Sequence, residues 1–266
     1  MKKIGVVILL SLLVLTGCSP KEDTSNTFTV GMECGYAPYN WTEPSKTDSA
    51  VQIDGGQYCD GYDVQIGKII ADKLGKTLVI KKLSWEGLIL SLQTGQIDAI
   101  IAGMSPTEER KKEVTFGESY MDNALVILSR SDDPITTISE LEGKDVAVET
   151  QSSGQSALEK NDIYDKLKEM QKYTNIQDAL LALNAKTVDA IVADVTFAGF
   201  TLAKDPTQYV ISDETFDSEY YAIGFRKDDD DSFKDAVDAA ISQLIESGVA
   251  KEISEKWLGK DLIKRP

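Results

Sequence analysis

Three segments of the chain place polar and aromatic side chains directly after predicted strands. They are residues 31–39, 102–110 and 193–194. In α/β proteins, small molecules bind at the carboxyl ends of the strands, often between two lobes, so these segments form the candidate binding site. The chain has no histidine, which removes the commonest general base and a frequent metal ligand. The pattern favours capture of a small molecule, and we expect neither a metal nor a cofactor.

Alternating strands and helices would position these segments. Residues 61–74 show helical spacing, with Tyr62, Ile66, Ile70 and Leu74 at steps of four residues. The buried run 97–102 is typical of a parallel strand. The remaining predicted strands are 28–31, 77–81, 145–148, the strand at Ile191 and 220–225, and further helices are predicted at 84–92, after Ser152, after Ile176 and in a C-terminal pair. This alternation predicts an α/β architecture.

An internal repeat divides the chain. Residues 92–102 resemble residues 183–193, and each copy reads as helix, tight turn, aspartate and buried strand. Two copies of one α/β unit predict two lobes that are built alike. The aspartates, Asp98 and Asp189, fall in the turns, where we expect them to organise the turn backbone rather than to do chemistry.

The amino-terminal segment predicts secretion. Lys2 and Lys3 precede an apolar run, 4–15, which is shorter than the roughly 20 residues that span a bilayer. The stretch Leu15-Thr16-Gly17-Cys18 resembles a bacterial lipobox, which implies cleavage before Cys18 and lipid on its sulfur. The alternative is an ordinary signal peptide with an incidental cysteine. We therefore assign 1–17 to a signal peptide and 18–26 to a lipid-anchored tether.

Composition narrows the partners. The chain carries a net charge of −16, and without Lys2 and Lys3 it has 26 basic and 44 acidic residues, for a net charge of −18. Such a chain is repelled by phosphate backbones, so we expect no nucleic acid partner. After cleavage about 249 residues remain, which suits one large domain or two small ones.

Besides Cys18, the cysteines are Cys34 and Cys59. An even pair outside the cytoplasm can form a disulfide, which here would close a loop of about 26 residues. Two free thiols are the alternative, and the sequence leaves both open.

Four stretches together carry a family resemblance. They are Gly35-Tyr36-Ala37-Pro38-Tyr39, Gly61-Tyr62-Asp63-Val64, Trp85-Glu86-Gly87-Leu88 and residues 98–114. With this order and spacing the chain, from about 27 to 258, resembles family 3 solute-binding proteins, the extracytoplasmic receptors of polar amino-acid ABC importers. The resemblance implies a type II two-lobe periplasmic-binding-protein-like fold, in which each lobe is a mainly parallel sheet flanked by helices. Lobe 1 would comprise 27–122 plus 219–266 and lobe 2 would comprise 123–218, with two hinge crossings near 121–124 and 216–220.

The resemblance assigns the two ends of an amino-acid ligand. Arg110 matches the arginine that grips the α-carboxylate, and a guanidinium can bind a carboxylate through two hydrogen bonds. Ser105 and the backbone at Ala102 and Gly103 match groups that support this carboxylate. Asp194 matches the acid that binds the α-ammonium. The alternatives are a solvated surface charge at Arg110 and a helix N-cap at Asp194.

Ser152 and Ser153 match a polar loop that opens a helix in lobe 2, where backbone amides favour a carboxylate. The family usually has glycine at the Gln151 position, so the loop shape departs from the pattern. Tyr36 and Trp85 match aromatics that flank the ligand side chain, with ordinary core packing as the alternative.

Glu33 matches a position where relatives often place an acid near the ligand side chain. Aromatic faces plus a carboxylate suit a cationic side chain. Family members with similar residues also take glutamine or cystine. One departure is large, because residues 42–60 lengthen the loop after Tyr39, and a Cys34–Cys59 bridge would hold this insertion beside the cleft.

The implied function is that of the substrate-binding component of an ABC importer, and not an enzyme. It would capture a free, cationic L-amino acid between two lobes and deliver it to a membrane permease, as a monomer anchored to the bilayer through acylated Cys18. Its place would be the extracytoplasmic face of the cell membrane of a Gram-positive cell. The alternatives are a cyclohexadienyl-dehydratase-like enzyme that uses a carboxylate such as Glu33, a surface adhesin or signalling receptor with a vestigial cleft, and a receptor for glutamine or cystine.

Overall fold

A computed structural model describes residues 26–227 and 229–263. The predicted signal peptide, Cys18 and all of the predicted tether except Asn26 lie outside the described residues. Within the described part, no helix is long and apolar enough to cross a membrane. The same residues contain no group of acidic or cysteine side chains arranged to hold a metal ion.

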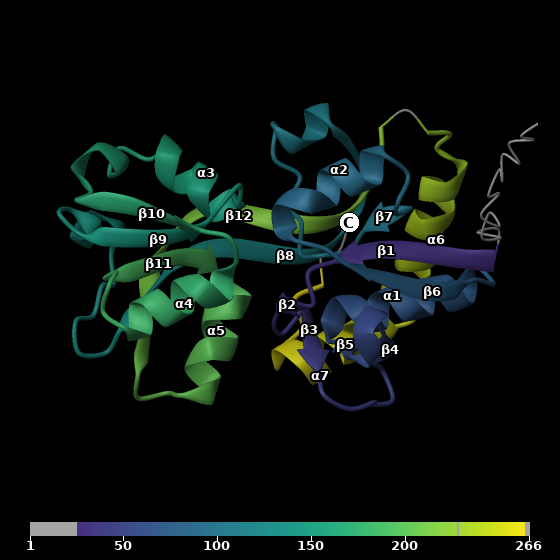
Figure 1. The fold of residues 1–266 in the computed structure, drawn as a ribbon, viewed down its shortest axis with the longest axis horizontal. Coiled ribbons are helices and arrows are strands. Elements are labelled where there is room, and N and C mark those ends of the chain that lie inside the picture. The colour runs from purple at the N-terminus through teal and green to yellow at the C-terminus, as the bar shows by residue number, and fades with distance from the viewer. Residues whose placement is uncertain (1–25, 228, 264–266) are drawn as a thin grey trace, which may run out of the picture.

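One eight-stranded sheet runs through the whole molecule (Figure 1). In spatial order its strands are β10 (Glu169–Tyr173), β9 (Asp145–Glu149), β11 (Ala190–Asp194), β8 (Val114–Arg130), β12 (Tyr209–Arg226), β7 (Ala99–Ile100), β1 (Thr27–Met32) and β6 (Thr77–Lys82). The pairs of β1 with β6 and β7 are parallel, as are those of β9 with β10 and β11. The long strands β8 and β12 pair antiparallel with their neighbours and with each other.

Helices flank both halves of this sheet (Figure 1). They are α1 (Tyr62–Lys73), α2 (Leu88–Gln93), α3 (Ser153–Lys160), α4 (Ile176–Asn184), α5 (Val195–Lys204), α6 (Ser232–Glu246) and α7 (Val249–Leu258). Short 3-10 turns are η2 (Asp54–Gly56), η3 (Trp85–Gly87), η4 (Arg110–Lys112), η5 (Ile138–Leu141) and η6 (Tyr164–Lys166). The helix predicted at 84–92 is thus η3 followed by α2. The α/β architecture is as predicted.

Figure 1 shows two lobes side by side, joined through β8 and β12. Lobe 1 is built around β1, β6 and β7, and lobe 2 is built around β9, β10 and β11. The predicted crossings, 121–124 and 216–220, lie within β8 and β12. The two lobes therefore share a sheet at their junction while each keeps helices of its own.

The internal repeat has a structural counterpart. β1 is the central partner of β6 and β7, and β9 is the central partner of β10 and β11. In lobe 1, Asp98 Oδ2 accepts a 2.8 Å hydrogen bond from the amide of Thr29, and in lobe 2, Asp189 Oδ2 accepts a 2.9 Å bond from the amide of Asp145. The sequence analysis predicted that these aspartates organise the backbone of their own turns. Instead, each carboxylate accepts a hydrogen bond from a backbone amide of the neighbouring central strand.

The strand predicted at 97–102 is shorter in the structure. Only Ala99 and Ile100 pair in the sheet, although Ile97 and Ala102 are also buried. The chain leaves the sheet soon after Ile100, since Gly103 has a φ of 58°, in the left-handed region that glycine tolerates. Burial of the flanking residues explains why the apolar run was longer than the strand.

The insertion at 42–60 contributes to a second, four-stranded sheet. Its order is β2 (Gly35–Tyr36), β3 (Asn40–Glu43), β5 (Tyr58–Asp60) and β4 (Val51–Gln52). Cys34, just before β2, is bonded to Cys59 in β5, with their Cα atoms 5.6 Å apart. The insertion is therefore a set of paired strands on lobe 1 rather than a simple loop.

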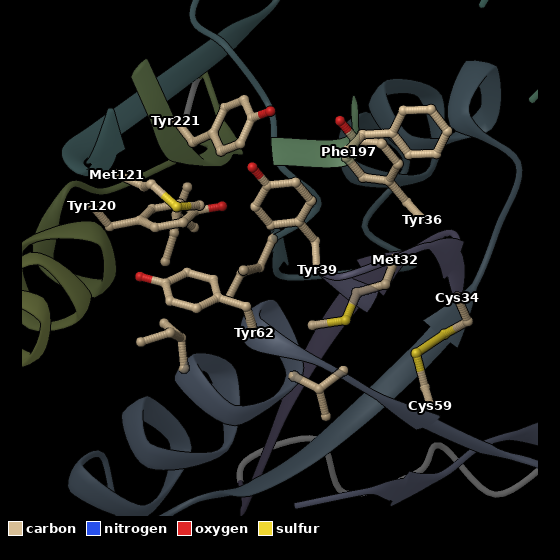
Figure 2. Close-up of a cluster of buried hydrophobic side chains, with 14 of the residues drawn as sticks. Met32, Cys34, Tyr36, Tyr39, Cys59, Tyr62, Tyr120, Met121, Phe197 and Tyr221 are labelled. Atoms are coloured by element: carbon tan, nitrogen blue, oxygen red, sulfur yellow. A yellow bond between two sulfur atoms is a disulfide. The ribbon is translucent and has the colours of Figure 1, made fainter. Parts of the chain in front are cut away.

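Tyrosines fill the core between the small sheet and the hinge strands, as Figure 2 shows. The ring of Tyr39 lies 5.1 Å from that of Tyr36 and 5.3 Å from that of Tyr221. Asp63 is buried beside them and accepts hydrogen bonds from Asn40 Nδ2 at 3.1 Å and the Tyr120 hydroxyl at 3.1 Å. This polar, aromatic core lies directly under the strand ends that were expected to carry the site.

The Cys34–Cys59 bond yields the first prediction. Protein lacking residues 1–18 should contain no free thiol when it is denatured without reductant, and two after reduction. Because the bond closes a loop of about 26 residues, the chain-entropy model predicts that reduction lowers the free energy of unfolding by about 3 kcal/mol. Thiol titration and denaturant unfolding with and without reductant would measure both effects. Two thiols in the unreduced, denatured protein would contradict the prediction.

Candidate ligand-binding site

A small cavity of about 20 Å³ lies between the lobes. Nine of the ten predicted ligand-binding residues line it, and Ser105 is the exception. The lining consists of Glu33, Tyr36, Trp85, Ala102, Gly103, Arg110, Glu149, Ser152, Ser153 and Asp194. Strand ends from both lobes therefore converge on one cavity, as the positions of the three polar segments indicated.

Arg110 begins η4 in lobe 1 and is buried, with 8% of its surface exposed. Its Nη1 donates to the carbonyl oxygen of Ser105 at 2.8 Å, and its Nη2 donates across the cleft to the carbonyl oxygen of Gln151 at 2.9 Å. The guanidinium carbon lies 4.9 Å from the centre of the Trp85 ring. Arg110 is therefore not a solvated surface charge. Burial lowers the pKa of Arg110, and the nearby charges of Glu219, Asp194 and Glu149 oppose this effect.

Asp194 ends β11 in lobe 2, directly before α5. Its carboxylate accepts hydrogen bonds from the Tyr36 hydroxyl of lobe 1 and from Nδ2 of Asn123. Asp194 occupies the N-cap position of α5, as the alternative predicted, but its side chain makes no capping hydrogen bond. Burial raises the pKa of Asp194, and hydrogen bonds such as that from Tyr36 act in the opposite direction.

Tyr36 combines packing with a polar role. Its ring stacks on those of Tyr39, at 5.1 Å, and Phe197, at 6.1 Å (Figure 2). The backbone of Gly103 passes close beneath it, since a Cβ atom at Gly103 would lie 3.1 Å from the Tyr36 ring. A hydrogen bond from the Gly103 amide reaches buried Asp63. Tyr36 can therefore pack in the core and line the binding site at the same time.

The serines at and near the cavity have different hydrogen-bond partners. Ser152 is the N-cap of α3, and its Oγ accepts from the amide of Gln155 at 3.0 Å. The hydroxyl of Ser105 donates to Glu219 at 2.8 Å, and the hydroxyl of Ser153 also bonds Glu219. Two hydroxyls, one from each lobe, thus converge on a carboxylate beside Arg110. The support of a ligand carboxylate by Ser105 stays a prediction, and in this structure the Ser105 hydroxyl donates to Glu219.

Sequence reasoning missed Glu149 and Glu219. Glu149 is the last residue of β9 and lines the cavity. The strand-end rule that identified Asp194 would also have identified Glu149. Glu219 lies in β12 at a predicted hinge crossing. No sequence pattern marks Glu219, because its role depends on contacts with Ser105 and Ser153, which are 114 and 66 positions away.

Acidic side chains outnumber basic ones around the cavity. The lining residues include the carboxylates of Glu33, Glu149 and Asp194 and the single cation of Arg110. Burial raises the pKa of Glu33 to about 7. Burial raises the pKa of Glu149 well above its usual range, and the charges of Glu33 and Asp194 raise it further. Such a site can hold a small molecule that offers one carboxylate and more than one cationic group.

Glu33 yields the second prediction. The unfolded chain loses this proton near the ordinary pKa of 4.5, whereas the folded protein keeps it to about 7. The contribution of Glu33 to stability is therefore lost as the pH rises from about 4.5 to 7, at about 1.4 kcal/mol per unit of pKa difference. Glu33→Gln should accordingly become more stable relative to the wild type as the pH rises from 5 to 8.

Denaturant unfolding of ligand-free protein at several pH values would measure this trend. Glu169→Gln is the matched control, because it removes the same charge from an exposed position at the start of β10. If the difference in unfolding free energy between Glu33→Gln and the wild type stayed flat over this range, the burial of an ionisable Glu33 would be disproved.

Comparison with known proteins places this geometry in a family. Residues 28–260 match the model of the bacterial extracellular solute-binding proteins, family 3. The arginine-binding extracellular protein ArtP of Bacillus subtilis is 28% identical over 250 residues, covering 91% of this chain and 92% of ArtP.

Solved structures agree. The P235GK mutant of ArgBP from T. maritima is 34% identical, with a TM-score of 0.77 over 89% of this chain and 97% of that one. A Streptococcus pneumoniae ABC uptake transporter substrate binding protein with bound histidine is 26% identical, with a TM-score of 0.82 over 91% of this chain and 96% of that one.

These comparisons confirm the predicted fold class, which is the two-lobe, type II periplasmic-binding-protein fold. The relatives are binding proteins rather than enzymes. The chain therefore belongs to the bacterial extracellular solute-binding proteins of family 3.

Proposed function

We propose that this protein is the receptor of an ABC importer and captures a cationic L-amino acid between its lobes. The observation that carries the proposal is the placement of Arg110 and Asp194 on opposite sides of one cavity. The guanidinium suits an α-carboxylate, and the carboxylate suits an α-ammonium. An amino-acid zwitterion carries its carboxylate and its ammonium on the same α-carbon, so both groups can bind in one small cavity.

The surroundings of the ligand side chain support a cation. Glu33 provides a carboxylate in lobe 1, and the faces of Tyr36 and Trp85 provide π-electron density. Beyond Trp85 and Arg110 lies a larger hollow of about 260 Å³, whose lining includes the carboxylates of Glu86, Glu109, Glu113 and Glu159. Acidic walls raise the local concentration of a cation. The relatives named for arginine and crystallised with histidine support the same class of ligand.

Contacts across the cleft suggest how binding is converted into a signal. Trp85 Nε1 donates to the Gln151 carbonyl oxygen at 3.3 Å, and Lys160 pairs with Glu109 at 3.3 Å. Both contacts join the lobes in a closed arrangement. A ligand that touches Arg110 and Asp194 together binds this arrangement better than an open one, so it shifts the population toward closure. Hinge closure of this kind is an established motion of periplasmic binding proteins. The closed form would then dock on a membrane permease.

The cellular setting is also part of the proposal. Cleavage before Cys18 and acylation of its sulfur would hold the protein on the extracytoplasmic face of a Gram-positive cell membrane. Residues 18–26 would serve as a tether, and the protein would act as a monomer. The chain's negative charge supports this arrangement, because it repels anionic lipid and makes a covalent anchor useful.

Ligand binding is the third prediction. Protein lacking residues 1–18, stripped by denaturation and refolding, should be stabilised by L-arginine or L-lysine in a thermal-shift panel of amino acids that includes glutamine and cystine. A ligand at 100 times its dissociation constant should add about 2.7 kcal/mol. Arg110→Ala should abolish the shift, because the ligand carboxylate loses its partner. Lys111→Ala is the control, since Lys111 is a neighbouring but exposed cation.

Two outcomes of the panel would contradict the proposal. No shift with any amino acid would refute an amino-acid receptor and would favour an enzyme or a signalling receptor. Shifts with glutamine or cystine alone would retain the receptor but reject a cationic ligand.

Membrane attachment is the fourth prediction. Full-length protein expressed in a Gram-positive host should fractionate with membranes and incorporate labelled palmitate. Cys18→Ala should be released into the medium without label. It lacks the sulfur that carries the lipid, and the apolar run 4–15 is too short to span the bilayer in its place. Equal membrane retention of Cys18→Ala and wild type, without label in either, would disprove lipid anchoring through Cys18.

A further inference from the structure

Glu149 is a buried acid on the lobe 2 side of the cavity. It is the last residue of β9, and 7% of its surface is exposed. The backbone amide of Ile176, the first residue of α4, lowers the pKa of Glu149 and so opposes part of the effect of burial. The Glu149 side chain therefore lies at a strand end, buried, and lines the cavity.

One carboxylate oxygen of Glu149 is buried without a partner. Among the described residues, Glu149 Oε1 is fully shielded from solvent and no hydrogen bond reaches it. An unpaired buried acceptor is costly, and a buried carboxylate oxygen more so. A buried carboxylate that lines the cavity with one open acceptor is suited to receive an N–H group from a ligand.

Glu33 lines the same cavity from lobe 1. The two carboxylates line one cavity, and the charge of Glu33 raises the pKa of Glu149. Arg110 and Asp194 complement the two ends of an amino-acid backbone, so Glu33 and Glu149 remain for the side chain. A cation placed between them would remove the repulsion and satisfy acceptors on both lobes.

The number and arrangement of N–H donors on the ligand side chain decide whether it can bind both carboxylates. A guanidinium is planar, stays charged and carries five N–H donors on more than one edge, so it can donate to two carboxylates at once. A side-chain amide has only two N–H donors and an oxygen that would face a carboxylate. A urea group has the shape of a guanidinium but lacks the charge and replaces one donor nitrogen with an acceptor.

We propose that Glu149 is a specificity-determining residue that, together with Glu33 on the opposite lobe, selects an L-amino acid with a guanidinium side chain. This inference rests on the proposed function, because it requires that Arg110 and Asp194 hold the backbone of an amino acid. It goes beyond a general preference for cations, because it assigns Glu149 as a second acceptor and requires a side chain that can donate to carboxylates on both lobes. Since Glu149 belongs to lobe 2, the contact also makes the side chain of the ligand part of lobe closure.

The test compares L-arginine, L-lysine and L-citrulline, the uncharged urea analogue of arginine, by calorimetry at pH 8. The proteins are the wild type, Glu149→Gln and the surface control Glu169→Gln. The wild type and control should prefer arginine over both other ligands. Glu149→Gln should lower the affinity for arginine at least about tenfold and narrow the preference for arginine over citrulline by a similar factor, because one charged acceptor is replaced by an amide. Thermal unfolding without ligand would verify that the isosteric variant folds.

A preference for arginine over citrulline that changes less than about twofold in Glu149→Gln would overturn the assignment of Glu149. If the wild type binds lysine more tightly than arginine, the proposal that Glu33 and Glu149 select a guanidinium side chain is wrong. Both results leave the proposed amino-acid receptor intact. If the wild type binds none of the three ligands in calorimetry and no amino acid in the thermal-shift panel, the proposed function itself fails.

Discussion

The buried guanidinium of Arg110 is the interaction on which the cleft depends. A cation removed from water is costly unless hydrogen-bond acceptors and opposite charges surround it. Arg110 meets this requirement with carbonyl oxygens from both lobes, at Ser105 and Gln151, with the face of Trp85, and with neighbouring carboxylates. Because its acceptors come from both sides of the cleft, the same contacts that stabilise the charge also hold the lobes together.

The shared sheet lets these contacts form without merging the lobes. β8 and β12 run through both halves, so the turn η4 that carries Arg110 and the strand ends that carry Asp194 and Glu149 line one cavity. Within each lobe, an aspartate carboxylate fastens the central strand, Asp98 in lobe 1 and Asp189 in lobe 2. The strands of each lobe thus present functional side chains near their ends, and β8 and β12 are the strands at which the proposed hinge motion would bend.

Local patterns predicted the parts of the site that follow from chain order. Buried runs located the strands, and the rule that ligands bind at strand ends placed Asp194 beside the cavity. The contacts that depend on distant pairing were not predictable. Glu219 looked like one more acid in an acidic chain until folding placed Ser105 and Ser153 against it. The insertion at 42–60 read as a loop, because its strands of two to four residues are too short to show a periodicity.

The excess of carboxylates in the cleft connects stability with recognition. In the ligand-free protein, burial raises the pKa of Glu33 and of Glu149, so their ionisation opposes folding. A cationic ligand reverses the sign of this effect, because the ionised forms then gain a partner. An anionic ligand would add to the repulsion, and a neutral one would leave the acceptor on Glu149 unpaired. In the proposed receptor, these unsatisfied groups would disfavour anionic and neutral ligands, and a cationic ligand would stabilise the closed state by pairing with them.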